Sequence, residues 1–152
     1  MRAVCSKIMR MFLVLRLGAL ASVFVLKAGA AFALCMDGRH PDVAAGFRVS
    51  RYVITAIVES SRNESSADDP EGVADIVYTV RVVRVFKGKP GRYLTLWSEN
   101  TSGGFPMHIG KEYLLFVETS QDGDFVDSCG QSGLLDQSKG ELEEVEKMAE
   151  RR

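Results

Sequence analysis

The stretch that decides the fold runs from residue 74 to residue 87 and reads ADIVYTVRVVRVFK. Apolar side chains recur here at every second position, which is the period of a β-strand, and the alternating set is Ile76, Tyr78, Val80 and Val82. Fourteen residues is long for a strand, and long strands in small domains usually bend. We therefore expect this strand to curve and to contribute to both halves of a small barrel.

The segments on either side of this strand complete the expected sheet. Counting the long strand, we predict five strands, at residues 51–59, 74–87, 93–97 and 112–119, with a short last one at 125–126. The polar stretch 60–72 is expected to form a hairpin tip, and residues 35–50 an irregular lead-in. This pattern favours a small five-stranded OB-fold-like barrel. An immunoglobulin-like sandwich is the alternative, because Trp97 lies between two cysteines, but that fold usually has seven strands.

The C-terminal segment has a different periodicity. Leu142, Val145 and Met148 recur at three-residue steps among glutamates between residues 139 and 150. This spacing predicts an amphipathic helix with one narrow apolar stripe, which we expect to cover a barrel end or a sheet face. The predicted fold class is therefore all-β with a C-terminal helix.

The N-terminal 33 residues are typical of a secretory signal. Basic residues precede an uncharged apolar core from Leu17 to Leu26, and a small-residue tail ends in an Ala-x-Ala site at Ala33. We predict cleavage after Ala33 and export of a single domain, residues 34–152, to the periplasm or the extracellular space, without membrane insertion. The alternative is an uncleaved signal that anchors the chain in a membrane.

The charge balance restricts the class of partner. The chain has 19 basic and 20 acidic residues; the signal contains five of the basic and none of the acidic ones, so the exported part has a net charge of −6. This charge argues against a nucleic-acid partner, which needs a basic face. A local basic strip is nevertheless present, and it could contact an acidic protein or polymer or simply form a solvated strand face; it comprises Arg81, Arg84, Lys87, Lys89 and Arg92. The oligomeric state is not predicted.

Two cysteines remain after the predicted cleavage. Cys5 lies within the signal, whereas Cys35 and Cys129 lie near the two ends of the exported domain. Because export brings the chain into an oxidising compartment, we predict a Cys35–Cys129 disulfide. Closing a loop of this length stabilises the fold by about 4–5 kcal/mol in the chain-entropy model.

The sequence indicates no catalytic or metal centre. No nucleophile–base arrangement, Gly-x-Ser-x-Gly motif or phosphate-binding glycine loop is present, so we predict that the protein is not an enzyme and has no cofactor. A metal site would need three or four converging ligands. His40 with Asp37 and Asp42 nearby, and His108 far along the chain, match no ligand motif.

Three stretches together resemble a known family. The long strand ends in VFKG at residues 85–88, residues 110–116 read GKEYLLF, and residues 129–135 read CGQSGLL just before the acidic helix. With Cys35 at the front, the chain resembles the TIMP-like (tissue inhibitor of metalloproteinase-like, or netrin-module) OB-fold proteins that bacteria export, over most of residues 35–148. Members often carry another cysteine in the loop before the Tyr-Leu-Leu-Phe strand, whereas residues 102–105 here read SGGF.

The resemblance implies a module that acts by binding. True inhibitors of this family chelate the protease zinc with the free amine and carbonyl of an N-terminal cysteine, but cleavage after Ala33 leaves Leu34 before Cys35 and displaces that amine. We therefore expect a non-catalytic exported binding module whose partner is a protein or an envelope component. The alternatives are a metalloprotease inhibitor that acts through the N-terminal edge at Cys35, and a membrane-tethered structural envelope protein.

Overall fold

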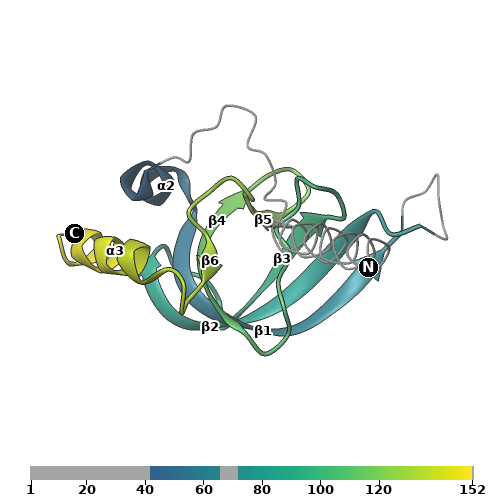
Figure 1. The fold of residues 1–152 in the computed structure, drawn as a ribbon, viewed down its shortest axis with the longest axis horizontal. Coiled ribbons are helices and arrows are strands. Elements are labelled where there is room, and N and C mark those ends of the chain that lie inside the picture. Colours follow the sequence, from purple (N-terminus) through teal and green to yellow (C-terminus); the bar gives the residue numbers. More distant parts are fainter. Residues whose placement is uncertain (1–41, 66–71, 152) are drawn as a thin grey trace, which may run out of the picture. The chain divides into compact units, whose positions relative to one another are not determined.

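The computed structural model describes residues 42–65 and 72–151, which all belong to one unit, Ala33–Arg152. The predicted fold class is confirmed: these residues form a small OB-fold-like barrel with a C-terminal helix (Figure 1). The elements are α2 (Val43–Val49), β1 (Tyr52–Glu64), β2 (Asp75–Lys87), β3 (Tyr93–Glu99), β4 (Glu112–Thr119), β5 (Asp124–Val126), β6 (Gly133–Leu134) and α3 (Lys139–Glu150).

Five strands close the barrel in the order β1-β2-β3-β5-β4, and β4 pairs back onto β1. The β3–β5 pairing is parallel and consists of a single residue pair, Trp97 with Phe125. The other pairings of the described strands are antiparallel. β6 pairs with the start of β4, on the edge of β4 opposite β1. The barrel is thus closed by one short seam between β3 and β5.

The long strand curves as the sequence predicts (Figure 1). Its register against β1 shifts between Val53 and Ile54 and again between Thr55 and Ala56, and at each shift β2 contains the extra residue, which is Phe86 or Val83. Such bulges increase twist and bend a strand. Because of this curvature, β2 pairs with β1 along its whole length, whereas it pairs with β3 only as far as Arg81.

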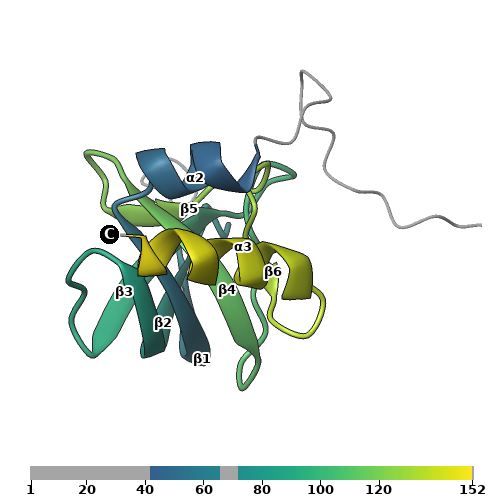
Figure 2. The same ribbon diagram turned by 90° about the vertical axis from the view of Figure 1, so that its left-hand side faces the viewer.

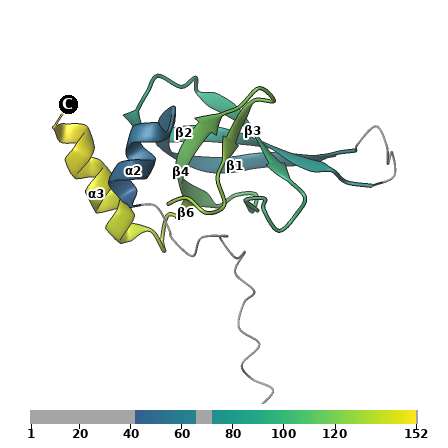
Figure 3. The ribbon, with the colours of Figure 1, turned by 90° about the horizontal axis from the view of Figure 1, so that it is seen from above.

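The barrel strands bury two separate apolar clusters. Alternate residues fill the barrel interior, including Ile54, Leu96 and Leu115, each with no exposed surface. Val53, Leu114 and Phe116 lie on the opposite face of β1 and β4, where α2 and α3 cover them. Figures 2 and 3 show the two helices beside each other on this face. The apolar stripe of α3 packs as predicted, since Val145 is fully buried and Leu142 and Met148 are partly buried.

Two segments that the sequence predicts to be irregular are regular in the structure. The described part of the lead-in 35–50 contains α2, which Asp42 caps by accepting a hydrogen bond from the backbone N–H of Ala45. The hairpin tip expected at 60–72 begins later than predicted, because β1 continues to Glu64. Residues Ser60–Glu64 are exposed, so their pairing with β2, and not side-chain burial, holds them in the strand.

A lysine at the end of β2 holds α2 in place. The Lys87 Nζ donates hydrogen bonds to the backbone carbonyls of Phe47, Arg48 and Ser50, at 2.7, 2.7 and 2.6 Å. These carbonyls lie at the C-terminal end of α2, where a helix has unsatisfied acceptors and a negative partial charge. A helix of seven residues is unstable in isolation, and Lys87 connects this one to the barrel.

We expect Lys87→Met to lower the free energy of unfolding by about 2 kcal/mol, because it removes charged hydrogen bonds while keeping the apolar stem. Lys89→Met is the matched control, since Lys89 is exposed two residues further along. Urea unfolding of both variants measures the difference. Equal loss in the two variants would contradict a capping role for Lys87.

Candidate functional site

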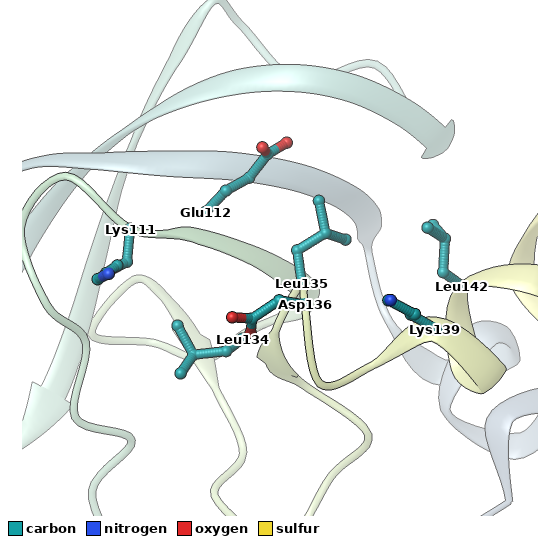
Figure 4. A pocket seen from close by; sticks show the side chains of 7 residues that line it. All are labelled: Lys111, Glu112, Leu134, Leu135, Asp136, Lys139 and Leu142. Carbon is teal, nitrogen blue, oxygen red and sulfur yellow. The ribbon is translucent and has the colours of Figure 1, made fainter.

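A groove lies beside the barrel where the start of β4, the β6 segment and the N-terminal end of α3 meet (Figure 4). Its volume is about 430 Å³. It is open to solvent, and seven residues line it: Lys111, Glu112, Leu134, Leu135, Asp136, Lys139 and Leu142. We take it as the candidate binding site of the described residues.

Backbone pairing positions the β6 side of the groove. In β6, Leu134 pairs with Tyr113 of β4, and the backbone N–H of Leu135 then donates to the Glu112 carbonyl at 3.0 Å. The chain turns immediately, and the Ser138 N–H donates to the Leu134 carbonyl at 3.1 Å before α3 begins. A larger residue at position 133 would require the Ser138 hydroxyl to move, because a Cβ on Gly133 would lie 2.7 Å from the Ser138 Oγ.

The groove combines apolar and charged side chains. Leu134, Leu135 and Leu142 provide its apolar surface, and Figure 4 shows Leu135 between Glu112 on one side and the α3 residues on the other. The charged residues are two of each sign: Lys111, Lys139, Glu112 and Asp136. None of these four takes part in an ion pair with another residue of the described ranges. The groove therefore offers apolar contact together with unpaired charges of both signs.

The predicted disulfide lies only partly within the described residues. Cys129 is in the turn after β5, where its N–H donates to the Asp127 Oδ1 at 2.9 Å. Cys35 and the cleavage site at Ala33 lie outside the described residues, so the Cys35–Cys129 pairing and the cleavage stay predictions. The first described element nevertheless lies near this turn, because a Cβ on Gly46 of α2 would be 3.9 Å from the Gln131 Cγ.

Three residues of the basic strip are engaged within the fold. Arg81 Nε lies 2.6 Å from Glu59 Oε1, Arg84 Nη2 lies 2.8 Å from Glu146 Oε1 of α3, and Lys87 caps α2. Because these three residues contact other parts of the fold, the strip is better interpreted as a solvated strand face with a structural role than as a ligand site. Lys89 and Arg92 are exposed, and Arg92 lies over the ring of Tyr93.

The histidines and aspartates considered for a metal do not assemble among the described residues, where no group of three potential ligands occurs. Asp42 caps α2, and exposed His108 lies in the loop before β4. Asp37 and His40 lie outside the described residues.

The sequence did not predict the groove itself. Two of the stretches that carry the family resemblance, residues 110–116 and 129–135, line it together because β6 pairs with β4. Their proximity depends on a two-residue strand, which no periodicity reveals. The one feature of the sequence that could have indicated the groove is the leucine pair at 134–135, directly before a predicted helix.

Neither described helix is long and apolar enough to cross a membrane. No protein-family model matches the chain, and no curated protein matches its sequence. The TIMP-like resemblance therefore stays a prediction from the motifs quoted above.

Proposed function

We propose that the protein is an exported, non-catalytic binding module that accommodates a segment of a partner protein or envelope component in the groove between β4, β6 and α3. The observation that carries this proposal is the set of four charged residues around three leucines; none of the four forms an ion pair with another described residue. An apolar centre bordered by charged residues matches the arrangement of a protein contact surface, where the apolar part contributes affinity and the charges at the rim orient the partner.

Export and the disulfide are part of the proposal. The signal at residues 1–33 delivers the domain to an oxidising compartment, and the Cys35–Cys129 bond then closes it. Sequencing the N-terminus of the exported protein distinguishes the alternatives. A start at Leu34 supports the binding module, a start at Cys35 supports zinc-protease inhibition through its free amine, and a retained signal supports the membrane-tethered form.

Site-specific photocrosslinking tests the groove in its native compartment. A benzoylphenylalanine at position 139 is expected to yield an adduct with one partner, whereas the same residue at position 89, which is exposed on the β2–β3 turn, yields none. Adduct formation at both positions, or at neither, would contradict a specific partner at the groove.

Charge reversal measures how much the groove contributes to the affinity for the partner. We expect Lys111→Glu together with Lys139→Glu to weaken affinity for the crosslinked partner by about tenfold or more, because both changes replace a cation that orients the partner by a carboxylate that repels the same groups. Lys89→Glu together with Lys147→Glu is the matched control, since it changes the net charge equally at exposed positions outside the groove. Equal affinity of the two double variants would locate the partner elsewhere.

A further inference from the structure

A second, smaller pocket lies at the β3–β5 seam, away from the residues that line the groove. Its volume is about 140 Å³, and its walls include Trp97, Phe125, Glu99 and Asp127. This volume admits a single side chain, whereas pockets for drug-sized ligands are larger, from roughly 300 Å³.

Two aromatic rings form one wall of this pocket. Trp97 and Phe125 are the single parallel pair that closes the barrel, and their ring centroids lie 5.5 Å apart with the planes tilted by 37°. Close packing holds the segments around this wall: a Cβ on Gly104 would collide with the Glu99 carbonyl, and a Cβ on Gly123 would lie 3.4 Å from the Trp97 Cδ1. The turn before β5 therefore rests against the Trp97 ring, and the loop after β3 rests against the backbone at the end of β3.

Two carboxylates complete the pocket. The Glu99 Oε2 accepts a hydrogen bond from the Thr101 hydroxyl at 3.1 Å, and the Asp127 Oδ1 accepts one from the Cys129 N–H at 2.9 Å. Each carboxylate is thus oriented through one of its oxygens. No described residue donates a hydrogen bond to its second oxygen. No lysine or arginine of the described ranges forms an ion pair with either.

We propose that this pocket binds an arginine side chain of a partner polypeptide. A guanidinium is a flat cation that stacks on an aromatic ring, and its forked N–H groups match carboxylate oxygens. Arginine satisfies both walls together at neutral pH, since an ammonium lacks the planar face, a neutral amide lacks the charge, and an ordinary histidine is mostly uncharged at pH 7. The pocket is independent of the groove, so either proposal can fail while the other stands.

Nuclear magnetic resonance tests the pocket directly, because Trp97 is the chain's one tryptophan and gives a single indole N–H signal. The ¹⁵N-labelled exported protein is titrated with acetyl-Gly-Arg-Gly-amide. We expect a saturable shift of this signal and of the Glu99 and Asp127 amide signals, with a dissociation constant on the order of a millimolar. The corresponding glutamine peptide is expected to cause none, and the lysine peptide to bind several-fold more weakly.

Isosteric variants separate the pocket from general electrostatic attraction. Glu99→Gln together with Asp127→Asn is expected to raise the dissociation constant about tenfold, because it removes both charges and keeps the hydrogen-bond acceptors. Glu143→Gln together with Glu144→Gln, on the exposed face of α3, makes the same change in net charge and is expected to leave binding unchanged. No saturable shift, equal binding of the lysine or glutamine peptide, or equal weakening by the two double variants would overturn the proposal.

Discussion

Replacing Cys35 by serine is expected to lower the free energy of unfolding of the oxidised domain, residues 34–152, by about 4–5 kcal/mol. The predicted bond to Cys129 closes a loop of about 95 residues, and a longer loop restricts the unfolded chain more. Small domains have a total stability of only about 5–15 kcal/mol, so the variant should lose a large share of its stability. Urea unfolding of the oxidised wild type and the variant measures the difference.

The structure makes this bond geometrically reasonable. The Cys129 turn is held by two bonds to Asp127, one to its carboxylate and one from the Gly130 N–H to its carbonyl at 3.1 Å. Gly46 of α2 lies beside Gln131, so the first described helix is close to this turn. Ten residues lie between Cys35 and Gly46, which is more than enough chain to reach the turn.

Cysteine variants provide the internal controls for this prediction. Cys35→Ser, Cys129→Ser and the double variant should all lose the same stability, because each removes the same bond. Reductant should lower the stability of the wild type by the same amount. Cys5→Ser should have no effect on the exported protein, since Cys5 lies in the predicted signal. Losses that add in the double variant, or a wild type that is insensitive to reductant, would refute the Cys35–Cys129 pairing.

Side-chain periodicity explains which elements could be predicted from the sequence. The limits of β4 and α3 agree with the prediction, and β2 begins one residue later than expected. β2 and α3 each have a regular apolar pattern, whereas β4 is buried on both faces and is recognisable by its unbroken apolar run from Tyr113 to Val117. Residues Ser60–Glu64 of β1 have no such pattern. Their strand conformation follows from β2, which pairs with them on one side and with β3 on the other.

The lead-in helix shows a different limit of sequence reasoning. Asp42 is a good capping residue, and Val43 and Phe47 are spaced by four, so the local signals of α2 were present. However, a seven-residue helix forms only with tertiary support, here from Phe116 below it and Lys87 at its end. The groove and the aromatic pocket were unpredictable for a related reason, because each is assembled from segments that are distant along the chain.

Replacing Gly88 by alanine is expected to lower the free energy of unfolding by about 4 kcal/mol. Gly88 follows β2 with a φ of +83°, a backbone conformation that costs other residues about 1–2 kcal/mol. In addition, a Cβ at this position would lie 2.6 Å from both the Arg51 carbonyl oxygen and the Tyr52 Cδ1. The carbonyl belongs to the backbone just before β1, so relieving this overlap requires a shift of β1 against β2 and costs about 1–3 kcal/mol more.

Gly110 separates the two contributions, because its φ is +80° but, apart from its chain neighbours, no heavy atom of the described residues lies within 4 Å of the position that a Cβ would occupy. Gly110→Ala should therefore show the backbone cost alone, about 1–2 kcal/mol, and the difference between the two variants gives the cost of the overlap with β1. Urea unfolding of both proteins provides the comparison. Equal loss of stability in the two alanine variants would show that a Cβ fits at position 88. The close approach of Gly88 to the start of β1 would then be wrong.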